Sequence, residues 1–248
     1  MKKISFLLVA AVLTASVCVQ NSYGQNILDD ITFGVRAGAN FTKFGGSDAD
    51  VFSELIVESL GSYGLKIDMK KPSKPGIQLG VVASYSMNEN LMFQPGIIFS
   101  QQGGKWKGTG SETYWGVKAE YDMEVEMTLN YLQIPLNYLY KHDLDSDISL
   151  LLQVGPYIGY GINGKLKMKA TVKAGGTSEN ISEEDDLTFG NDGELNFIDL
   201  GLGLGAGLLF KEKIHVGLGY NLGVAKIASD VNMKNKGFAL TVSYFFGK

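Results

Sequence analysis

Two histidines and a single arginine are the side chains in this sequence best suited to catalysis or charge-specific binding. His142 stands beside Asp143, and His215 lies in a run where apolar and small residues alternate. Catalysis by proton transfer or nucleophilic attack needs a base within hydrogen-bond reach of its substrate. No serine elbow or triad spacing surrounds either histidine. We therefore interpret His142 as a turn residue and His215 as an inward-facing residue that fills space inside the fold. We therefore expect no enzyme activity, no catalytic residue and no cofactor.

Arg36 is the only arginine, and it lies in the middle of another alternating run. If this run crosses a membrane, a guanidinium on the lipid face would cost about 2–4 kcal/mol, so the side chain should point inward. A buried guanidinium favours a carboxylate partner. We predict a polar pair in the lumen between Arg36 and Asp199, with Glu124 or Glu126 as alternative partners. A structural ion pair is the simpler interpretation, and a polar relay across the membrane is the other.

Two charged clusters could be taken for ligand sites. The acidic segment 179–186 carries oxygen ligands of the kind that Ca²⁺ or Mg²⁺ prefers, but it lacks EF-hand spacing and is expected to be a solvated loop. Lys165, Lys167 and Lys169 recur at period two, and they could be solvated, meet lipopolysaccharide phosphates or pair with the acidic segment. Clustered His or Cys ligands for a transition metal are absent from the sequence, so no metal site is predicted.

Four glycines at alternate positions superficially resemble a nucleotide-binding loop. They recur at period two inside a strand-like run, and no helical pattern follows them. We therefore expect them to make room for side chains inside the fold. The residues are Gly201, Gly203, Gly205 and Gly207.

Strands are the elements that must position these residues. Alternation of apolar with small or polar residues is typical of strands with two different faces. It occurs eight times, in residues 31–42, 75–88, 91–103, 122–141, 148–170, 198–208, 214–224 and 238–246.

The two faces of these strands are the reverse of those in a soluble sandwich. One face carries large apolar residues, and the other carries small, mostly uncharged ones, which suits lipid outside and a narrow polar interior. A soluble barrel is the alternative. We predict an all-β fold, an eight-stranded antiparallel up-and-down transmembrane β-barrel with long external loops. A net charge of −4 argues against nucleic acid as a partner.

The connections alternate between short and long. Short turns are predicted at 88–90, 141–147 and 211–213, and long loops at 43–74, 104–121 and 171–193, with an intermediate connection at 228–236. Outer-membrane barrels have short periplasmic turns and longer external loops. With an even number of strands, both termini are then expected in the periplasm.

Two segments depart from simple alternation. In 122–141 the apolar residues change parity, which predicts a β-bulge near Asn130 or Tyr131, or else a stretch 122–129 that projects beyond the lipid. In the first long loop, Val51, Phe52, Leu55, Ile56 and Leu60 recur at helical spacing. They predict a short amphipathic helix that caps the barrel or touches a partner.

The N-terminal segment, residues 1–24, is predicted to be a secretory signal peptide. Lys2 and Lys3 precede an apolar stretch at 4–15, too short for the roughly 20 residues of a membrane span. Cleavage after Gly24 would leave a barrel domain of residues 25–248 without any thiol, since Cys18 is the only cysteine. A lipoprotein acylated at Cys18 is the alternative.

Several stretches resemble the PorT-like family of outer-membrane β-barrels. They are GVRAGANF at 34–41, QPGIIFSQQG at 94–103, YLQIPL at 131–136, the glycine-alternating run 199–207 and YFF at 244–246. The order and spacing of these stretches extend over essentially the whole mature chain. The resemblance implies an eight-stranded barrel in the outer membrane of a Gram-negative cell, and its name-giving member is linked to protein secretion.

These observations favour a non-enzymatic outer-membrane barrel whose external loops serve surface interaction or envelope structure. The alternative, an accessory component of protein secretion or transport, is implied by the resemblance alone. Expected partners are outer-membrane lipid and lipopolysaccharide, the barrel assembly machinery and a protein at the external loops. An eight-stranded barrel is filled by its own side chains, so a general porin is not expected.

Overall fold

The computed structural model describes residues 31–62, 64–190 and 195–246, so the predicted signal peptide, residues 1–24, lies outside the described residues. In this part of the chain a ten-stranded antiparallel sheet is accompanied by one helix. β2 and β7 lie outside the ring, and the other eight strands close it, which confirms the predicted eight-stranded barrel. The ring strands are β1 (Ile31–Gly45), β3 (Lys74–Ser86), β4 (Leu91–Tyr114), β5 (Val117–Asp143), β6 (Ile148–Ala174), β8 (Ile198–Phe210), β9 (Ile214–Gly223) and β10 (Lys234–Phe246).

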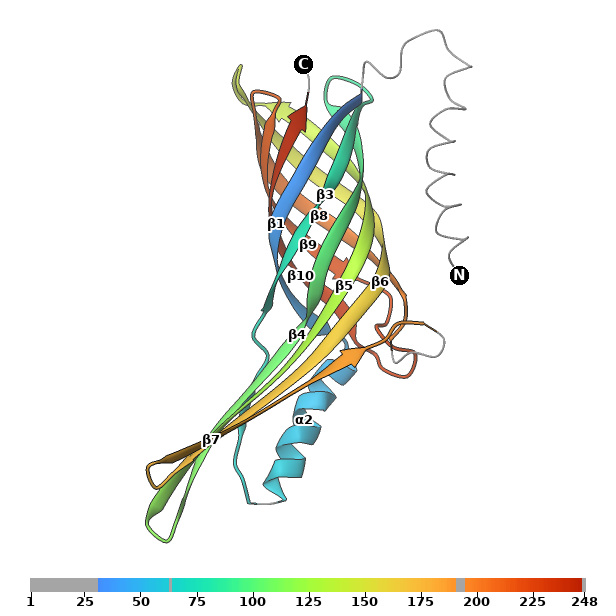
Figure 1. The fold of residues 1–248 in the computed structure, drawn as a ribbon. Helices are drawn as coiled ribbons and strands as arrows, with labels where there is room; N and C mark the ends of the chain where they lie inside the picture. The colour runs from blue at the N-terminus through green and yellow to red at the C-terminus, as the bar shows by residue number, and fades with distance from the viewer. Residues whose placement is uncertain (1–30, 63, 191–194, 247–248) are drawn as a thin grey trace.

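The first and last strands close the ring. β1 pairs with β10 from Phe33↔Phe246 to Gly45↔Lys234, and with β3 on its other side. The order around the barrel is β1-β3-β4-β5-β6-β8-β9-β10, so each strand of the ring lies next to its sequence neighbour (Figure 1). This is the up-and-down topology that the alternating runs predict.

The outer face of the barrel is apolar, as the alternation predicts. Leu79, Leu204 and Leu240 are 60%, 55% and 50% exposed, whereas the neighbouring Gly203 and Ala239 are buried. An apolar exterior of this extent has no water-soluble counterpart, but it matches the lipid-facing band of a membrane barrel.

Three short connections lie at one end of the barrel, together with the start of β1 and the end of β10 (Figure 1). The Lys211 N–H donates to the Asp147 carbonyl at 2.8 Å, which ties two of these turns together. Lys211 and Glu212 both have positive φ, as a two-residue hairpin turn requires. The predicted positions of the short turns are confirmed.

The end of the barrel opposite the short turns differs from the prediction. The segments 104–121 and 171–193, predicted as loops, are largely strand, because β4, β5 and β6 continue far beyond the ring. β4 turns into β5 through Trp115 and Gly116, and β6 turns through Gly175 and Gly176 into the additional strand β7 (Thr177–Leu187), with positive φ at all four turn residues. Residues 104–129 and 164–187 form a narrow sheet, hereafter the projection, which extends away from the barrel (Figure 1).

The irregularity predicted near Asn130 or Tyr131 is confirmed in position. Asn130 pairs with Asn163 and Tyr131 with Gly161, so the pairing shifts there and Ile162 of β6 has no partner in β5. The inserted residue is thus on the neighbouring strand. One face of β5 stays buried along the strand, at Val125, Leu129, Tyr131 and Leu139.

Helix α2 (Ser47–Gly61) lies beside the projection and is longer than the predicted helical segment (Figure 1). The short strand β2 (Asp68–Lys70) follows it and pairs with residues 107–109 of β4. No helix among the described residues is long and apolar enough to cross a membrane.

Candidate functional site

Arg36 points into the barrel, as predicted, and is only 5% exposed. Its Nε donates to Ser243 Oγ at 3.0 Å, and one terminal nitrogen donates to Gln94 Oε1. Gln94 Nε2 in turn donates to Ser84 Oγ at 2.7 Å. The guanidinium therefore belongs to a buried polar cluster of neutral side chains that links β1, β3, β4 and β10.

Asp199 also points inward and is 3% exposed, but its partners differ from those predicted. Asn235 Nδ2 donates to Asp199 Oδ2 at 3.3 Å and to the Tyr131 hydroxyl oxygen at 3.2 Å. The structure contains no ion pair between Arg36 and Asp199, both of which it describes. The two charges belong to separate clusters.

The alternative partners proposed for Arg36 lie outside the ring. Glu124 and Glu126 are part of the projection, where Lys105 Nζ is 2.9 Å from Glu124 Oε1 and 3.6 Å from Glu126 Oε2. These carboxylates therefore pair with lysine. The sequence left their place open, because the change of parity in 122–141 fitted either a β-bulge or a stretch that projects beyond the lipid.

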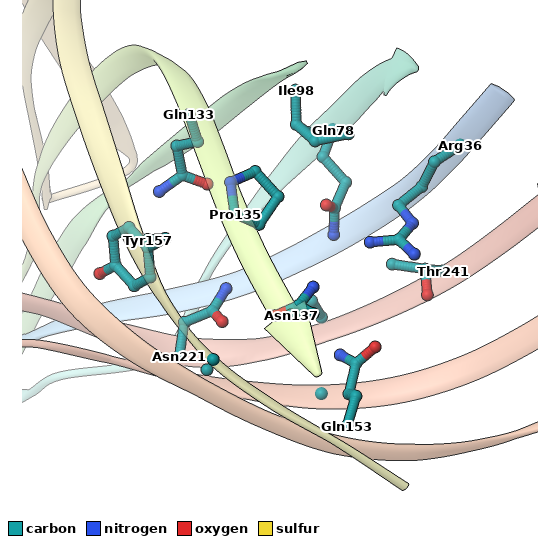
Figure 2. A pocket seen from close by; sticks show the side chains of 14 residues that line it. Arg36, Gln78, Ile98, Gln133, Pro135, Asn137, Gln153, Tyr157, Asn221 and Thr241 are labelled. Atoms are coloured by element: carbon teal, nitrogen blue, oxygen red, sulfur yellow. The ribbon is translucent and has the colours of Figure 1, made fainter. Parts of the chain in front are cut away.

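A cavity of about 50 Å³ lies in the lumen between the two clusters. Arg36 and Thr241 line one side of it and Tyr157 and Gln133 the other, with Asn221 nearby (Figure 2). This volume has room for a few water molecules but not for a metabolite. Polar lining and small volume together indicate a hydrated filling rather than a channel.

Apolar clusters close the lumen at both ends. At the end with the short turns, Leu139, Leu151 and Phe245 are buried in one cluster. At the end with the projection, Phe44, Trp106, Leu129, Leu195 and Met233 form part of another. The polar side chains of the lumen therefore lie between two apolar clusters.

His215 lies where the sequence analysis places it, whereas His142 belongs to the end of β5 and not to the predicted turn. His215 is buried, points inward and fills the space next to Gly207, where an added Cβ would be 2.4 Å from His215 Nε2. His142 is exposed near the end of β5 beside Asp143. Among the described residues no group of three His, Cys, Asp or Glu side chains is placed to hold a metal ion.

Aromatic residues flank the apolar exterior at both ends. Near the short turns, the ring of Phe93 contacts that of Tyr138 and the ring of Tyr244 contacts that of Phe246, with ring centroids 5.2 and 5.4 Å apart. Tyr160–Phe197 and Tyr220–Phe238 do so at the other end. Two aromatic girdles around an apolar band are typical of outer-membrane barrels. Beyond the second girdle the outward positions become polar, at Lys43, Lys236, Gln101 and Asn130.

The projection lies beyond that polar rim and has two unlike faces. Its apolar face is packed against α2 and β2: Trp106 is 2% exposed and its ring centroid is 4.8 Å from that of Phe52 in α2. The apolar residues of 122–129 that break the alternation in β5, such as Val125, belong to this face. The predicted projecting stretch is therefore confirmed, and its changed parity reflects a second apolar layer.

Helix α2 is fixed to the rim by polar contacts. The Asn232 backbone N–H donates to Asp48 Oδ2 at 2.8 Å, and Asn232 Nδ2 donates to Ser47 Oγ at 3.0 Å. The hydrogen bond from Asn232 is the main reason why the pKa of Asp48 lies below its usual value. Val51 and Leu55, on the side of the helix away from the buried Ala49 and Ser53, are exposed.

The lysine run is paired rather than only solvated. Lys165 and Lys167 of β6 both approach Glu184 of β7, at 2.5 and 3.7 Å, which selects the pairing alternative of the sequence analysis. The hydrogen bond from Lys165 lowers the pKa of Glu184. The acidic segment is strand β7 and not a loop, a feature that the hairpin-type pair Gly175-Gly176 could have indicated.

The family comparison agrees with this geometry. A family model described as "Outer membrane protein beta-barrel domain" matches residues 20–229. No curated protein sequence matches the chain. Similar solved structures include Ail, the attachment invasion locus protein of Yersinia pestis, with 15% identity, a TM-score of 0.31 and coverage of 87% of this chain and 98% of that one. Neisserial surface protein A has 17% identity and a TM-score of 0.35 over 86% and 97% of the two chains. The N-terminal barrel domain of Pseudomonas aeruginosa OprF has 8% identity and a TM-score of 0.29 over 86% and 97%.

Proposed function

The chain belongs to the outer membrane protein beta-barrel domain family, and on that premise we propose that it is a non-enzymatic outer-membrane protein whose projection acts in surface interaction. The barrel serves as the membrane anchor in this proposal. The projection, together with α2, is the part that meets other molecules outside the cell.

The orientation follows from the lengths of the connections. Outer-membrane barrels carry short turns on the periplasmic side and long connections outside. The three short turns and the ends of β1 and β10 lie at one end of the barrel, and the projection lies at the other. These lengths support a projection outside the cell, with the start of β1 and the end of β10 on the periplasmic side.

The closed lumen supports a role other than diffusive transport. The apolar clusters around Phe245 at one end and Trp106 at the other enclose a cavity too small for a solute. Among the described residues, Arg36 and Asp199 are held by neutral partners and His215 Nδ1 has no hydrogen-bond partner, so none of these groups is oriented for acid–base or nucleophilic chemistry. What remains for function is the exterior.

The single observation that carries the proposal is the projection itself. Strands of 24 and 27 residues are far longer than the roughly 9–11 needed to cross a bilayer. A barrel that served only as an envelope component would not need this additional sheet, its packed helix and its charged face.

The test shortens the projection without touching the barrel. Deleting 108–123 and 168–183 removes residues that pair with each other, and an Asn-Gly turn then joins Lys107 to Glu124 and Lys167 to Glu184. We expect this protein to insert normally, checked by heat-modifiable gel mobility. We also expect cells carrying it to lose attachment to protein-coated surfaces or cell–cell aggregation. Unchanged surface behaviour with normal insertion would contradict the proposal.

Orientation is tested separately by labelling whole cells with a membrane-impermeant maleimide. Thr113→Cys in the projection should react, whereas Ser146→Cys in a short turn should not. The sequence contains no cysteine after Cys18, so background labelling is absent once residues 1–24 are removed.

The resemblance to PorT-like barrels supports a second function, as an accessory of protein secretion. The shortened protein separates the two. A loss of secreted proteins from cells whose surface attachment is intact would favour the secretion role.

A further inference from the structure

Charges on one face of the projection alternate from strand to strand. Residues that share this face are aligned by the antiparallel pairing of β4 with β5, β5 with β6 and β6 with β7. The face carries Lys105 and Lys107 on β4, then Glu120, Asp122, Glu124 and Glu126 on β5, then Lys165, Lys167, Lys169 and Lys173 on β6, then Glu184 and Asp186 on β7.

Ion pairs join β4 to β5 and β6 to β7, and the register places Glu124 and Glu126 of β5 beside Lys169 and Lys167 of β6. Lys105 is within 2.9 Å of Glu124, and Lys165 contacts Glu184 and lies 3.9 Å from Asp186. Opposite charges on adjacent strands stabilise a sheet modestly, whereas like charges placed opposite one another destabilise it. The order of the rows is positive, negative, positive, negative.

β7 is the strand at which this order ends. It pairs with β6 and, among the described residues, with no other strand, so one edge of it presents free backbone N–H and C=O groups. β7 carries five carboxylates and no lysine or arginine. Glu183 and Asp185, on its other face, stand opposite Met168 and Leu166, so the lysines of β6 do not face them.

We propose that the free edge of β7 binds an extended basic polypeptide segment as an additional antiparallel strand. The basic residues of that segment lie opposite 183–186, and residues with high β-propensity lie opposite the less acidic half of β7, 177–182, where Glu179 is the one carboxylate. Since the added strand runs antiparallel, its basic part comes first in its sequence. This inference rests on the proposed function, because it requires the projection to be exposed outside the cell.

The charges disfavour other occupants of this edge. A second copy pairing β7 with β7 would place carboxylates opposite carboxylates. The basic strand β6 is covered on both sides by β5 and β7, and β4 is paired with β2 at Lys107. Lipopolysaccharide phosphates would be repelled by the same five carboxylates. The remaining explanation is that the acidic residues only protect the edge from unwanted pairing. The binding experiment described next distinguishes protection of the edge from binding.

The experiment uses the full chain in lipid nanodiscs and a fluorescent peptide about as long as β7. The peptide begins with a run of lysine and arginine and continues with valine and threonine. We expect saturable binding, measured by fluorescence anisotropy. A peptide with the reversed sequence has the same charge and composition, and a peptide N-methylated at alternate residues lacks the edge donors. Both should bind at least about tenfold more weakly than the original peptide. Equal binding of either one would overturn strand addition.

A charge-reversal variant tests the edge itself. Glu183→Lys with Asp185→Lys leaves the contacts of Lys165 with Glu184 intact and should weaken binding by about tenfold, since two attractive cross-strand contacts become repulsive. The matched control, Glu54→Lys with Glu58→Lys, makes the same change of net charge on exposed positions of α2 and should have no such effect. If both variants weaken binding equally, or neither does, the inference is wrong.

The outcomes also separate this inference from the proposed function. Cells that carry the charge-reversed protein and keep full surface attachment would overturn the assignment of the β7 edge alone. Cells that lose nothing when the whole projection is shortened would overturn the proposed function.

Discussion

Replacing Gly201 of β8 by alanine tests the packing that closes the lumen. A Cβ at this position would be 2.5 Å from the Leu222 carbonyl oxygen and 2.5 Å from the Tyr157 ring. Tyr157 borders the lumen cavity, so its ring can move by a small rotation. The carbonyl cannot move in the same way, because β8 and β9 are paired through Leu202 and Leu222.

The expected effect is a moderate loss of stability. Forcing one extra carbon into a packed interior costs about 1–3 kcal/mol. Alanine also restricts the unfolded chain more than glycine does, which returns about 0.4–1 kcal/mol. The variant Gly201→Ala should therefore unfold with a free energy about 1–2 kcal/mol lower than that of the natural sequence.

Gly219→Ala in β9 provides the matched control. There the added Cβ would be 3.5 Å from Gln153 Nε2 and 3.6 Å from the Leu204 carbonyl oxygen, which are ordinary contact distances. We expect its stability to be unchanged or slightly increased. Urea unfolding of the refolded barrel, followed by heat-modifiable gel mobility, measures both variants. If Gly201→Ala and Gly219→Ala unfold at the same urea concentration, the argument that glycine makes room for Tyr157 fails.

Further predictions concern the lumen and the helix. Arg36→Leu leaves Ser243 Oγ and Gln94 Oε1 without their donor, a cost of about 1–3 kcal/mol for each buried group, so a variant with undiminished heat resistance would refute the structural role. The protein in a planar bilayer should show no steady conductance, because apolar clusters close both ends; stable open-channel currents would disprove this. Because the pKa of Asp48 is lowered in the folded protein, its carboxylate stabilises α2 docking at neutral pH, and this contribution is lost as pH falls through the lowered pKa. After correction for the intrinsic pH dependence of amide exchange, the protection of α2 amides should fall over that range, and in Asp48→Asn this protection should stay constant there.

Much of the barrel could be predicted because its rule is local. In a strand between lipid and a narrow lumen, neighbouring side chains must differ, and Val35, Arg36 and Ala37 show this without any knowledge of the rest of the chain. The inward direction of Arg36 and Asp199 followed from the same rule. Their pairing did not, since which inward residues meet across a lumen depends on strand tilt and register.

The projection was decided by tertiary structure. Met123, Val125 and Leu129 are apolar on one parity, and Leu132 and Tyr138 on the other. The sequence predicted an irregularity at this point. In the structure the first set of residues packs under α2, whereas the second set faces outward from the barrel. No local pattern states which surface a distant helix will cover.

The sequence by itself thus determined the barrel, its eight strands, its apolar exterior and the ends at which its turns lie. The tertiary structure alone decided that two expected loops form a sheet, that Asp199 bonds Asn235, and that β7 ends a charged face with a free edge. The physical reason is that alternation is imposed on each strand by its immediate surroundings. Hydrogen-bond partners and strand edges instead depend on contacts between residues far apart in the chain.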